Sequence, residues 1–151
     1  MGSISVLIAV KNEASRTLLN DCLAEWGYGV TSAMDGDAVQ AVLQTTSFDI
    51  CILDWEMPGI NGFEICKWLR ANHLQAGPFV VLVAAQAQLE EVLKDTEGLN
   101  EAGANDYITE PFDLRHLRHR IAGLAQIVLL RQDVRAASMK NIDWTGGPAL
   151  P

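Results

Sequence analysis

Short apolar runs alternate along this chain with longer segments whose apolar residues recur at helical spacing. The pattern predicts strands over residues 4–10, 28–33, 48–53, 79–83 and 105–109, and helices over residues 16–26, 36–44, 62–71, 89–102 and from residue 113 onward. Nearly continuous apolar strands are typical of strands that are buried on both faces. The alternation therefore predicts a doubly wound α/β fold, with a parallel sheet between two layers of helices. In such folds ligands bind beyond the carboxyl ends of the strands.

The charged residues argue against two classes of partner. The formal net charge is −8, and an acidic surface repels both nucleic acid and anionic membranes. We therefore expect neither a nucleic-acid partner nor a membrane partner. The acidic excess lies early in the chain, since residues 1–112 hold 5 Lys/Arg against 16 Asp/Glu, whereas residues 113–151 hold 6 against 3.

The cysteine pattern favours a reducing compartment. Cys22, Cys51 and Cys66 lie in apolar runs without C-x-x-C spacing, so we expect free thiols. The N-terminus lacks the charged start and long apolar run of a secretory signal. The longest apolar run of the late chain, residues 127–130, is far too short to span a bilayer. These features predict a cytoplasmic protein.

Two motifs follow predicted strands. The segment D-W-E-M-P-G-I-N-G at residues 54–62 resembles the phosphoacceptor loop of two-component receiver domains, D-x-x-M-P-x-x-x-G. The segment G-A-N-D-Y-I-T-E-P-F at residues 103–112 resembles that family's G-A-x-D-Y-x-x-K-P-F. The resemblance to response regulator receiver domains covers about residues 4–124. It implies a flavodoxin-like, five-stranded parallel sheet with strand order 2-1-3-4-5 and an extended C-terminal helix.

The resemblance also implies a phosphorylation site. In receiver domains an aspartate accepts a phosphoryl group from a histidine kinase, a pair of acids holds Mg²⁺, and a Thr or Ser and a Lys contact the phosphoryl oxygens. The matching positions here are Asp54 for the acceptor, Val10 and Lys11 for the acid pair, Val83 for the Thr or Ser, Glu110 for the Lys, Tyr107 for the switch aromatic, and Glu56, Met57, Pro58 and Gly62 for the acceptor loop.

Four of these positions, Val10, Lys11, Val83 and Glu110, depart from the family pattern. Val10 offers Mg²⁺ no side-chain oxygen, and Lys11 adds a positive charge where the cation would lie. We therefore predict a degenerate site, or pseudo-receiver, with Mg²⁺ binding lost and no other cofactor. A half-buried carboxylate needs a partner. Lys11 is accordingly predicted to replace the metal, with its ammonium within about 4 Å of Asp54 or Glu110.

Other residues near the site have a functional and a plainer interpretation. Asn12 and Glu13 either cap the following helix, or a shifted register brings Glu13 toward the site. Tyr107 is either a moving switch or an aromatic packed at the sheet edge. Trp55 is either a partner contact or ordinary packing. The H-x-x-H spacing at residues 116–119 suits a metal, but the interleaved arginines favour a solvated basic helix face.

The last predicted helix is long, and with it we expect the chain to consist of three parts. Residues 1–124 are expected to form the receiver domain, residues 125–140 a linker or dimerisation helix, and residues 141–151 a flexible tail. The residues at 3-4-3-4 spacing that could pack this helix on the sheet are Leu114, Leu117, Ile121, Leu124 and Val128. The later apolar residues Ile127, Leu129, Leu130 and Val134 would be exposed, which indicates an interface.

The sequence thus predicts a non-enzymatic signalling module that is independent of phosphorylation. It would bind a protein partner, or a second copy of itself, through the C-terminal helix and the face formed by residues 89–102, 105–109 and the start of that helix. The alternative is a working phosphorelay receiver that uses Asp54, takes its phosphoryl group from a histidine kinase, and controls an attached or separate output domain such as a diguanylate cyclase. A small-molecule sensor that reuses the crevice is a third interpretation.

Overall fold

Five parallel strands form one sheet in the order β2-β1-β3-β4-β5. The computed structural model describes residues 3–72, 77–88, 90 and 103–144. The strands are β1 (Ser5–Ala9), β2 (Gly29–Ser32), β3 (Ile50–Asp54), β4 (Phe79–Ala85) and β5 (Asp106–Glu110), and all neighbouring pairs are parallel. This topology confirms the predicted flavodoxin-like, doubly wound fold.

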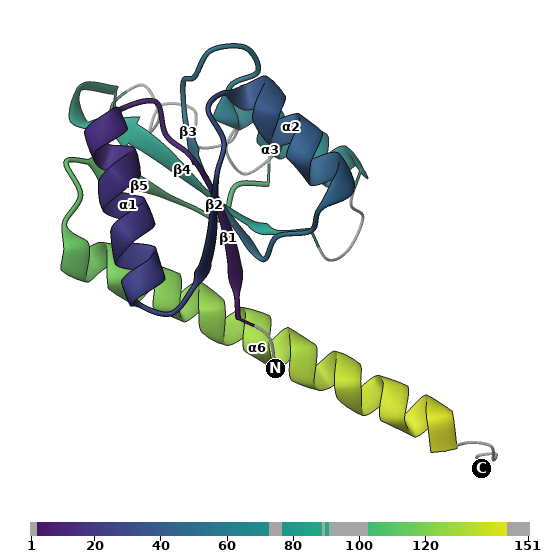
Figure 1. Ribbon diagram of the computed structural model, residues 1–151. Helices are drawn as coiled ribbons and strands as arrows, with labels where there is room; N and C mark the ends of the chain where they lie inside the picture. The colour runs from purple at the N-terminus through teal and green to yellow at the C-terminus, as the bar shows by residue number, and fades with distance from the viewer. Residues whose placement is uncertain (1–2, 73–76, 89, 91–102, 145–151) are drawn as a thin grey trace.

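Helices cover both faces of the sheet (Figure 1). On one face α2 (Gly36–Thr45) and α3 (Gly62–Asn72) pack on the sheet, and this buried cluster includes Leu7, Val39, Leu43, Leu53, Ile65 and Leu69. On the other face α1 (Glu13–Glu25) and α6 (Leu114–Trp144) pack on the sheet, and this cluster includes Val6, Leu19, Leu23, Ile52, Leu117 and Ile121. Because strand residues alternate between the clusters, each central strand is buried on both sides.

The start of α1 decides between the two interpretations of Asn12 and Glu13. Asn12 is the N-cap, and its side-chain oxygen accepts a hydrogen bond from the Ser15 backbone N–H at 2.9 Å. Glu13 lies in the first turn and is exposed. The capping interpretation is confirmed, so α1 begins at Glu13 rather than at residue 16. The predicted helix over residues 89–102 falls almost entirely outside the described residues.

The cysteines lie where the apolar pattern placed them. Cys51 and Cys66 are buried in the cluster beneath α2 and α3, and Cys22 on α1 is half-buried. All three are free thiols, as expected. Burial raises the pKa of the Cys51 thiol to about 12 and that of Cys66 to about 11. Both thiols are therefore protonated and unreactive near neutral pH.

Helix α6 continues well past the edge of the sheet (Figure 1). Leu117, Ile121 and Val128 are buried against the sheet, as predicted, whereas Leu114 is 39% exposed. The helix runs past residue 140 to Trp144, and residues 145–151 lie outside the described part. None of the helices in the described ranges is both long enough and apolar enough to cross a membrane.

Candidate functional site

Four of the predicted site residues meet at the carboxyl edge of the sheet. Asp54 ends β3 and lies beside Val83 of β4, while Glu110 ends β5 beside the last residue of β4. Val10 directly follows β1, and its side chain lies in the same buried cluster as Val83. Strand alternation places Asp54 and Glu110 on that face as well. The edge therefore combines two carboxylates with two valine side chains.

Asp54 is deeply buried and has one hydrogen-bond donor among the residues that the structure describes. Its side chain is 3% exposed, and it is the buried charged residue of the described chain. The backbone N–H of Lys11 donates to Asp54 Oδ2 at 2.5 Å. Burial raises the pKa of Asp54 to about 6, the Lys11 N–H opposes this rise, the charge of Glu110 adds to it, and the charge of the Lys11 side chain lowers it by a smaller amount. Asp54 therefore keeps a proton to an unusually high pH for an aspartate.

The prediction that the Lys11 ammonium forms an ion pair with Asp54 or Glu110 is wrong. The Lys11 side chain is exposed, and the ion pairs within the described ranges are Arg120–Asp106 and His116–Asp113. Lys11 reaches Asp54 through its backbone N–H instead. A backbone amide gives this hydrogen bond without burying an ammonium group and without fixing a long flexible side chain, both of which cost free energy.

Glu110 is held by a residue that the sequence analysis missed. The hydroxyl group of Ser15, in the first turn of α1, donates a hydrogen bond to Glu110 Oε2. The neighbouring Arg16 uses Nη1 to donate to the Val10 carbonyl oxygen at 3.1 Å. The sequence held a signal for the position of Ser15 and Arg16, although not for their hydrogen-bond partners. Once Asn12 is taken as the N-cap, Ser15 and Arg16 fall in the helix turn that begins at this edge of the sheet.

The acceptor loop is tightly packed behind Asp54. A Cβ atom added to Gly62 would lie 2.2 Å from the Asp54 carbonyl oxygen, so only glycine fits there. Met57 is buried, whereas Pro58 is exposed and accepts a backbone hydrogen bond from Gly36 at 3.2 Å. The exposed Glu56 accepts a hydrogen bond from Gln88 Nε2 at 3.0 Å. These contacts hold the acceptor loop closely against the end of β3.

Trp55 has a packing role in this loop. Its ring meets the Phe63 ring edge to face, with 5.4 Å between centroids. Both rings are partly buried and pack against the cluster beneath α2 and α3. The position of Trp55 thus agrees with ordinary packing, and part of the residue is still accessible at the surface.

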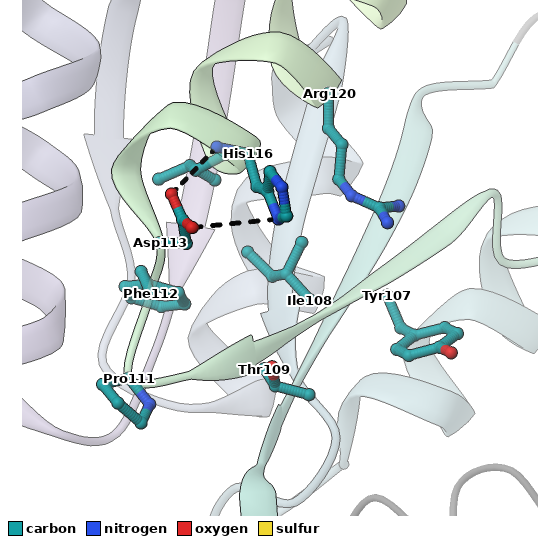
Figure 2. Close-up of a pocket in the computed structure, with 9 residues that line it drawn as sticks. Tyr107, Ile108, Thr109, Pro111, Phe112, Asp113, His116 and Arg120 are labelled. Atoms are coloured by element: carbon teal, nitrogen blue, oxygen red, sulfur yellow. Dashed lines mark hydrogen bonds and ion pairs between the residues drawn. The ribbon is translucent and has the colours of Figure 1, made fainter.

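A small pocket of about 150 Å³ lies between β5 and the start of α6 (Figure 2). Arg120 Nη1 donates to both oxygens of Asp106 at 2.5 Å, and His116 lies 4.0 Å from Asp113. The ring of Tyr107 points away from these residues and packs against the cluster beneath α2 and α3. In this structure Tyr107 is a packed aromatic residue, and its role as a switch stays a prediction.

Comparison with known proteins agrees with the two motifs. The family model of the response regulator receiver domain matches residues 6–122. This chain belongs to the response regulator receiver family. The receiver is 27% identical to the receiver domain of Francisella response regulator 1452, with a TM-score of 0.71 over 83% of this chain and 99% of that structure.

Curated relatives extend beyond the receiver. The chain is 34% identical over 143 residues to the alkaline phosphatase synthesis transcriptional regulatory protein PhoP of Bacillus subtilis, covering 93% of this chain and 55% of that protein. It is 35% identical over 117 residues to the sensory transduction protein RegX3 of Mycobacterium tuberculosis, covering 78% and 48% respectively. The receiver thus spans about half the length of these relatives.

The donor set of this receiver does not fit the Mg²⁺ ion that its family implies. Such an ion needs several oxygen ligands, usually including carboxylates. Val10 supplies no side-chain oxygen, and Glu110 already accepts the Ser15 hydroxyl. Across the described ranges, no three His, Cys, Asp or Glu side chains gather closely enough to hold a metal ion. Loss of Mg²⁺ binding stays a prediction that a titration can test.

Proposed function

We propose that this receiver acts in two-component signalling without being phosphorylated, as a protein-interaction module. The proposal rests on the charged groups around Asp54. The buried Asp54 carboxylate shares its sheet edge with Glu110 and Val83, and no cationic side chain pairs with either carboxylate in the described structure. The charge of Glu110 acts on Asp54 more strongly than the opposing charge of the exposed Lys11 side chain, so this edge opposes the arrival of a further anion.

Phosphoryl transfer depends on positive charge near the acceptor. Metal ions and cationic side chains stabilise the charge that spreads over the phosphoryl oxygens in the transition state. Glu110 replaces a cation with an anion, and it already raises the pKa of Asp54. Val83 offers no hydroxyl group to a phosphoryl oxygen. A phosphoryl group on Asp54 would thus be repelled by Glu110 and left without donors from these two positions.

The surfaces of this receiver suit binding rather than catalysis. The face formed by β5 and the start of α6 carries the Arg120–Asp106 ion pair and the pocket of Figure 2. Helix α6 adds exposed apolar residues beyond the sheet. We propose that this face and α6 bind a protein or a second copy of the chain, and that the receiver catalyses no reaction.

Incubation with acetyl phosphate and Mg²⁺, followed by intact-mass measurement, tests the proposal. We expect no phosphoryl adduct on the wild-type receiver. The positive control is a variant that restores the family pattern through Val10→Asp, Lys11→Asp, Val83→Thr and Glu110→Lys, and this variant should acquire one phosphoryl group. A wild-type adduct that disappears in Asp54→Asn would contradict the proposal.

The working phosphorelay receiver is a second candidate, because the acceptor loop keeps its packing. Gly62 still allows the loop to lie against the Asp54 backbone, and Met57 is still buried. In that case a histidine kinase would supply the phosphoryl group, and the output would lie in a further domain or protein. PhoP of Bacillus subtilis is a transcriptional regulatory protein by name, which favours a transcriptional output over a diguanylate cyclase.

A further inference from the structure

Helix α6 carries a second apolar stripe that does not contact the sheet. Ile127 is 44% exposed, Leu130 61% and Val134 66%. These three residues, with Arg131 and Arg135, line an open and mostly apolar groove along the helix. The stripe is separate from the buried residues Ala125 and Val128, which pack on the receiver's own sheet. Within the described part of the chain, nothing covers it.

The spacing of the stripe is that of a coiled-coil seam. Ile127, Leu130 and Val134 are separated by three and then four residues, which makes them successive a, d and a positions of a heptad. β-branched residues at a with leucine at d favour a parallel two-stranded coil over larger assemblies. The sequence continues the spacing with Ala137, Asn141 and Trp144, and α6 continues as far as Trp144.

We propose that a second copy of this chain covers the stripe, so that the two α6 helices form a parallel two-stranded coiled coil. This inference rests on the interaction role proposed above and names the partner for α6. From Ile127 to Trp144 the helix rises about 26 Å, at roughly 1.5 Å per residue. A two-fold pairing of identical stripes also closes on itself, because each residue of one helix meets its counterpart.

Charges beside the seam favour the parallel direction. Arg131 occupies an e position and Asp133 a g position. In an antiparallel pair centred on this segment, e would face e and g would face g, which would bring Arg131 to Arg131 and Asp133 to Asp133 of the second copy. In a parallel pair, Arg131 instead faces Gln126 of the second copy. Charges at e and g set the orientation of such pairs, so the like-charge contacts oppose the antiparallel form.

Arg131 also fixes the point where the helix leaves the receiver. Its guanidinium lies over the Phe79 ring, 4.3 Å from the centroid. Phe79 begins β4 and is buried at the amino-terminal edge of the sheet, opposite the edge that holds Asp54. This contact holds the helix against the domain beside the first seam residues. The seam is therefore presented in a defined direction, which lowers the cost of pairing.

Sedimentation of the full chain over a concentration series tests the proposal. We expect a reversible dimer whose dissociation constant rises by about tenfold or more in Leu130→Glu. Leu129→Glu is the matched control, because Leu129 is 38% exposed on the same helix but lies at a c position outside the seam. This control should keep the wild-type dissociation constant. Circular dichroism of each variant checks that the fold is unchanged.

Cysteine cross-linking tests the direction independently. In a parallel coil, Leu130→Cys should form a disulfide with Leu130→Cys of the second copy, and Val134→Cys should do the same. An antiparallel coil would cross-link mainly when the two variants are mixed, and that result would overturn the parallel arrangement. A wild-type monomer at all concentrations, or a dimer unaffected by Leu130→Glu, would overturn the coiled coil. Neither result would bear on the phosphorylation experiment, so the two proposals fail separately.

Discussion

The backbone N–H of Lys11 donates to the Asp54 carboxylate at 2.5 Å, while the Lys11 side chain is exposed to solvent. The residue that follows β1 therefore offers Asp54 a neutral backbone N–H at the place where receiver domains are expected to hold a metal ion. Glu110 lies on the same edge, held by Ser15. Burial raises the pKa of Asp54 to about 6, and the charge of Glu110 adds to this rise, so a proton binds Asp54 more readily than an ordinary aspartate.

Asp54→Asn should stabilise the receiver above neutral pH. The pKa of Asp54 is about 6 in the folded chain against an ordinary value of 3.8, so the folded state binds more protons between these values. The stability contributed by protonated Asp54 is complete below pH 3.8 and is lost as the pH rises through 6. Asparagine keeps the acceptor for the Lys11 N–H but carries no charge. At pH 7.5 the gain in unfolding free energy should be about 2 kcal/mol by urea denaturation.

The same variant at pH 4 supplies the control, since most of the gain should disappear there. Glu110→Gln should move the pKa of Asp54 toward its ordinary value, because the charge of Glu110 contributes to raising it. Carboxyl ¹³C shifts measured across the pH range would follow this pKa directly. Equal stabilisation by Asp54→Asn at both pH values would mean that Asp54 ionises normally.

Lys11→Ala should leave the stability nearly unchanged. The Lys11 side chain is exposed and makes no ion pair in the described structure, and the hydrogen bond to Asp54 uses the backbone N–H that alanine retains. Urea denaturation at pH 7.5 should differ from wild type by less than about 0.5 kcal/mol. Lys11→Pro removes that N–H and serves as the contrast, with a clear loss of stability. A loss of about 1–2 kcal/mol in Lys11→Ala, the size of a partly buried ion pair, would instead support the prediction that the Lys11 ammonium replaces the metal ion.

Ser15 and Glu110 should be energetically coupled. The hydroxyl group of Ser15 is the side-chain donor found for the half-buried Glu110 carboxylate. A double-mutant cycle of Ser15→Ala and Glu110→Ala should give a coupling free energy of about 1 kcal/mol. Thr17→Ala with Glu110→Ala is the matched control, because Thr17 is exposed on the same helix. If the coupling of Ser15 is no larger than that of Thr17, the hydrogen bond does not hold Glu110 in solution.

Gly62 and Gly123 should respond oppositely to alanine. A Cβ atom at Gly62 would lie 2.2 Å from the Asp54 carbonyl oxygen, whereas a Cβ atom at Gly123 would meet nothing within 4 Å. Gly62→Ala should therefore destabilise the fold by about 2 kcal/mol or more. Gly123 lies inside α6, so Gly123→Ala should stabilise it by about 0.5–1 kcal/mol through helix propensity. Thermal unfolding of both variants would show the opposite signs, and a stable Gly62→Ala would mean that the loop can shift away from Asp54.

The fold could be predicted from the sequence because its signals are local. Continuous apolar strands indicated the two-sided sheet, and the motifs at residues 54–62 and 103–112 brought in the strand order. The same motifs placed Asp54 and Glu110 on one edge, and the register of β3, β4 and β5 bears this out. The start of α1 was set too late because Asn12 and Glu13 are polar and carry no apolar periodicity.

The contacts within the site were less predictable because they join residues distant in sequence. The Ser15–Glu110 hydrogen bond spans 95 positions, and nothing near either residue points to the other. The role of Lys11 was assigned from its side-chain charge, whereas its backbone makes the contact. Residue type shows what a side chain can do, but the direction of the chain at a strand end decides which group of the residue faces the site.

The central claim is that the receiver acts without phosphorylation of Asp54. The backbone amide resonance of Lys11 provides the most direct test of this claim. This N–H is hydrogen-bonded to the Asp54 carboxylate, so any ligand on the acceptor must shift its ¹H–¹⁵N signal. We predict that Mg²⁺ with beryllofluoride, a phosphoryl mimic, leaves this signal unchanged in the wild-type receiver. The amide signal of the same position should shift in the variant that restores the family pattern. A saturable shift in the wild-type receiver that is absent from Asp54→Asn would contradict the account.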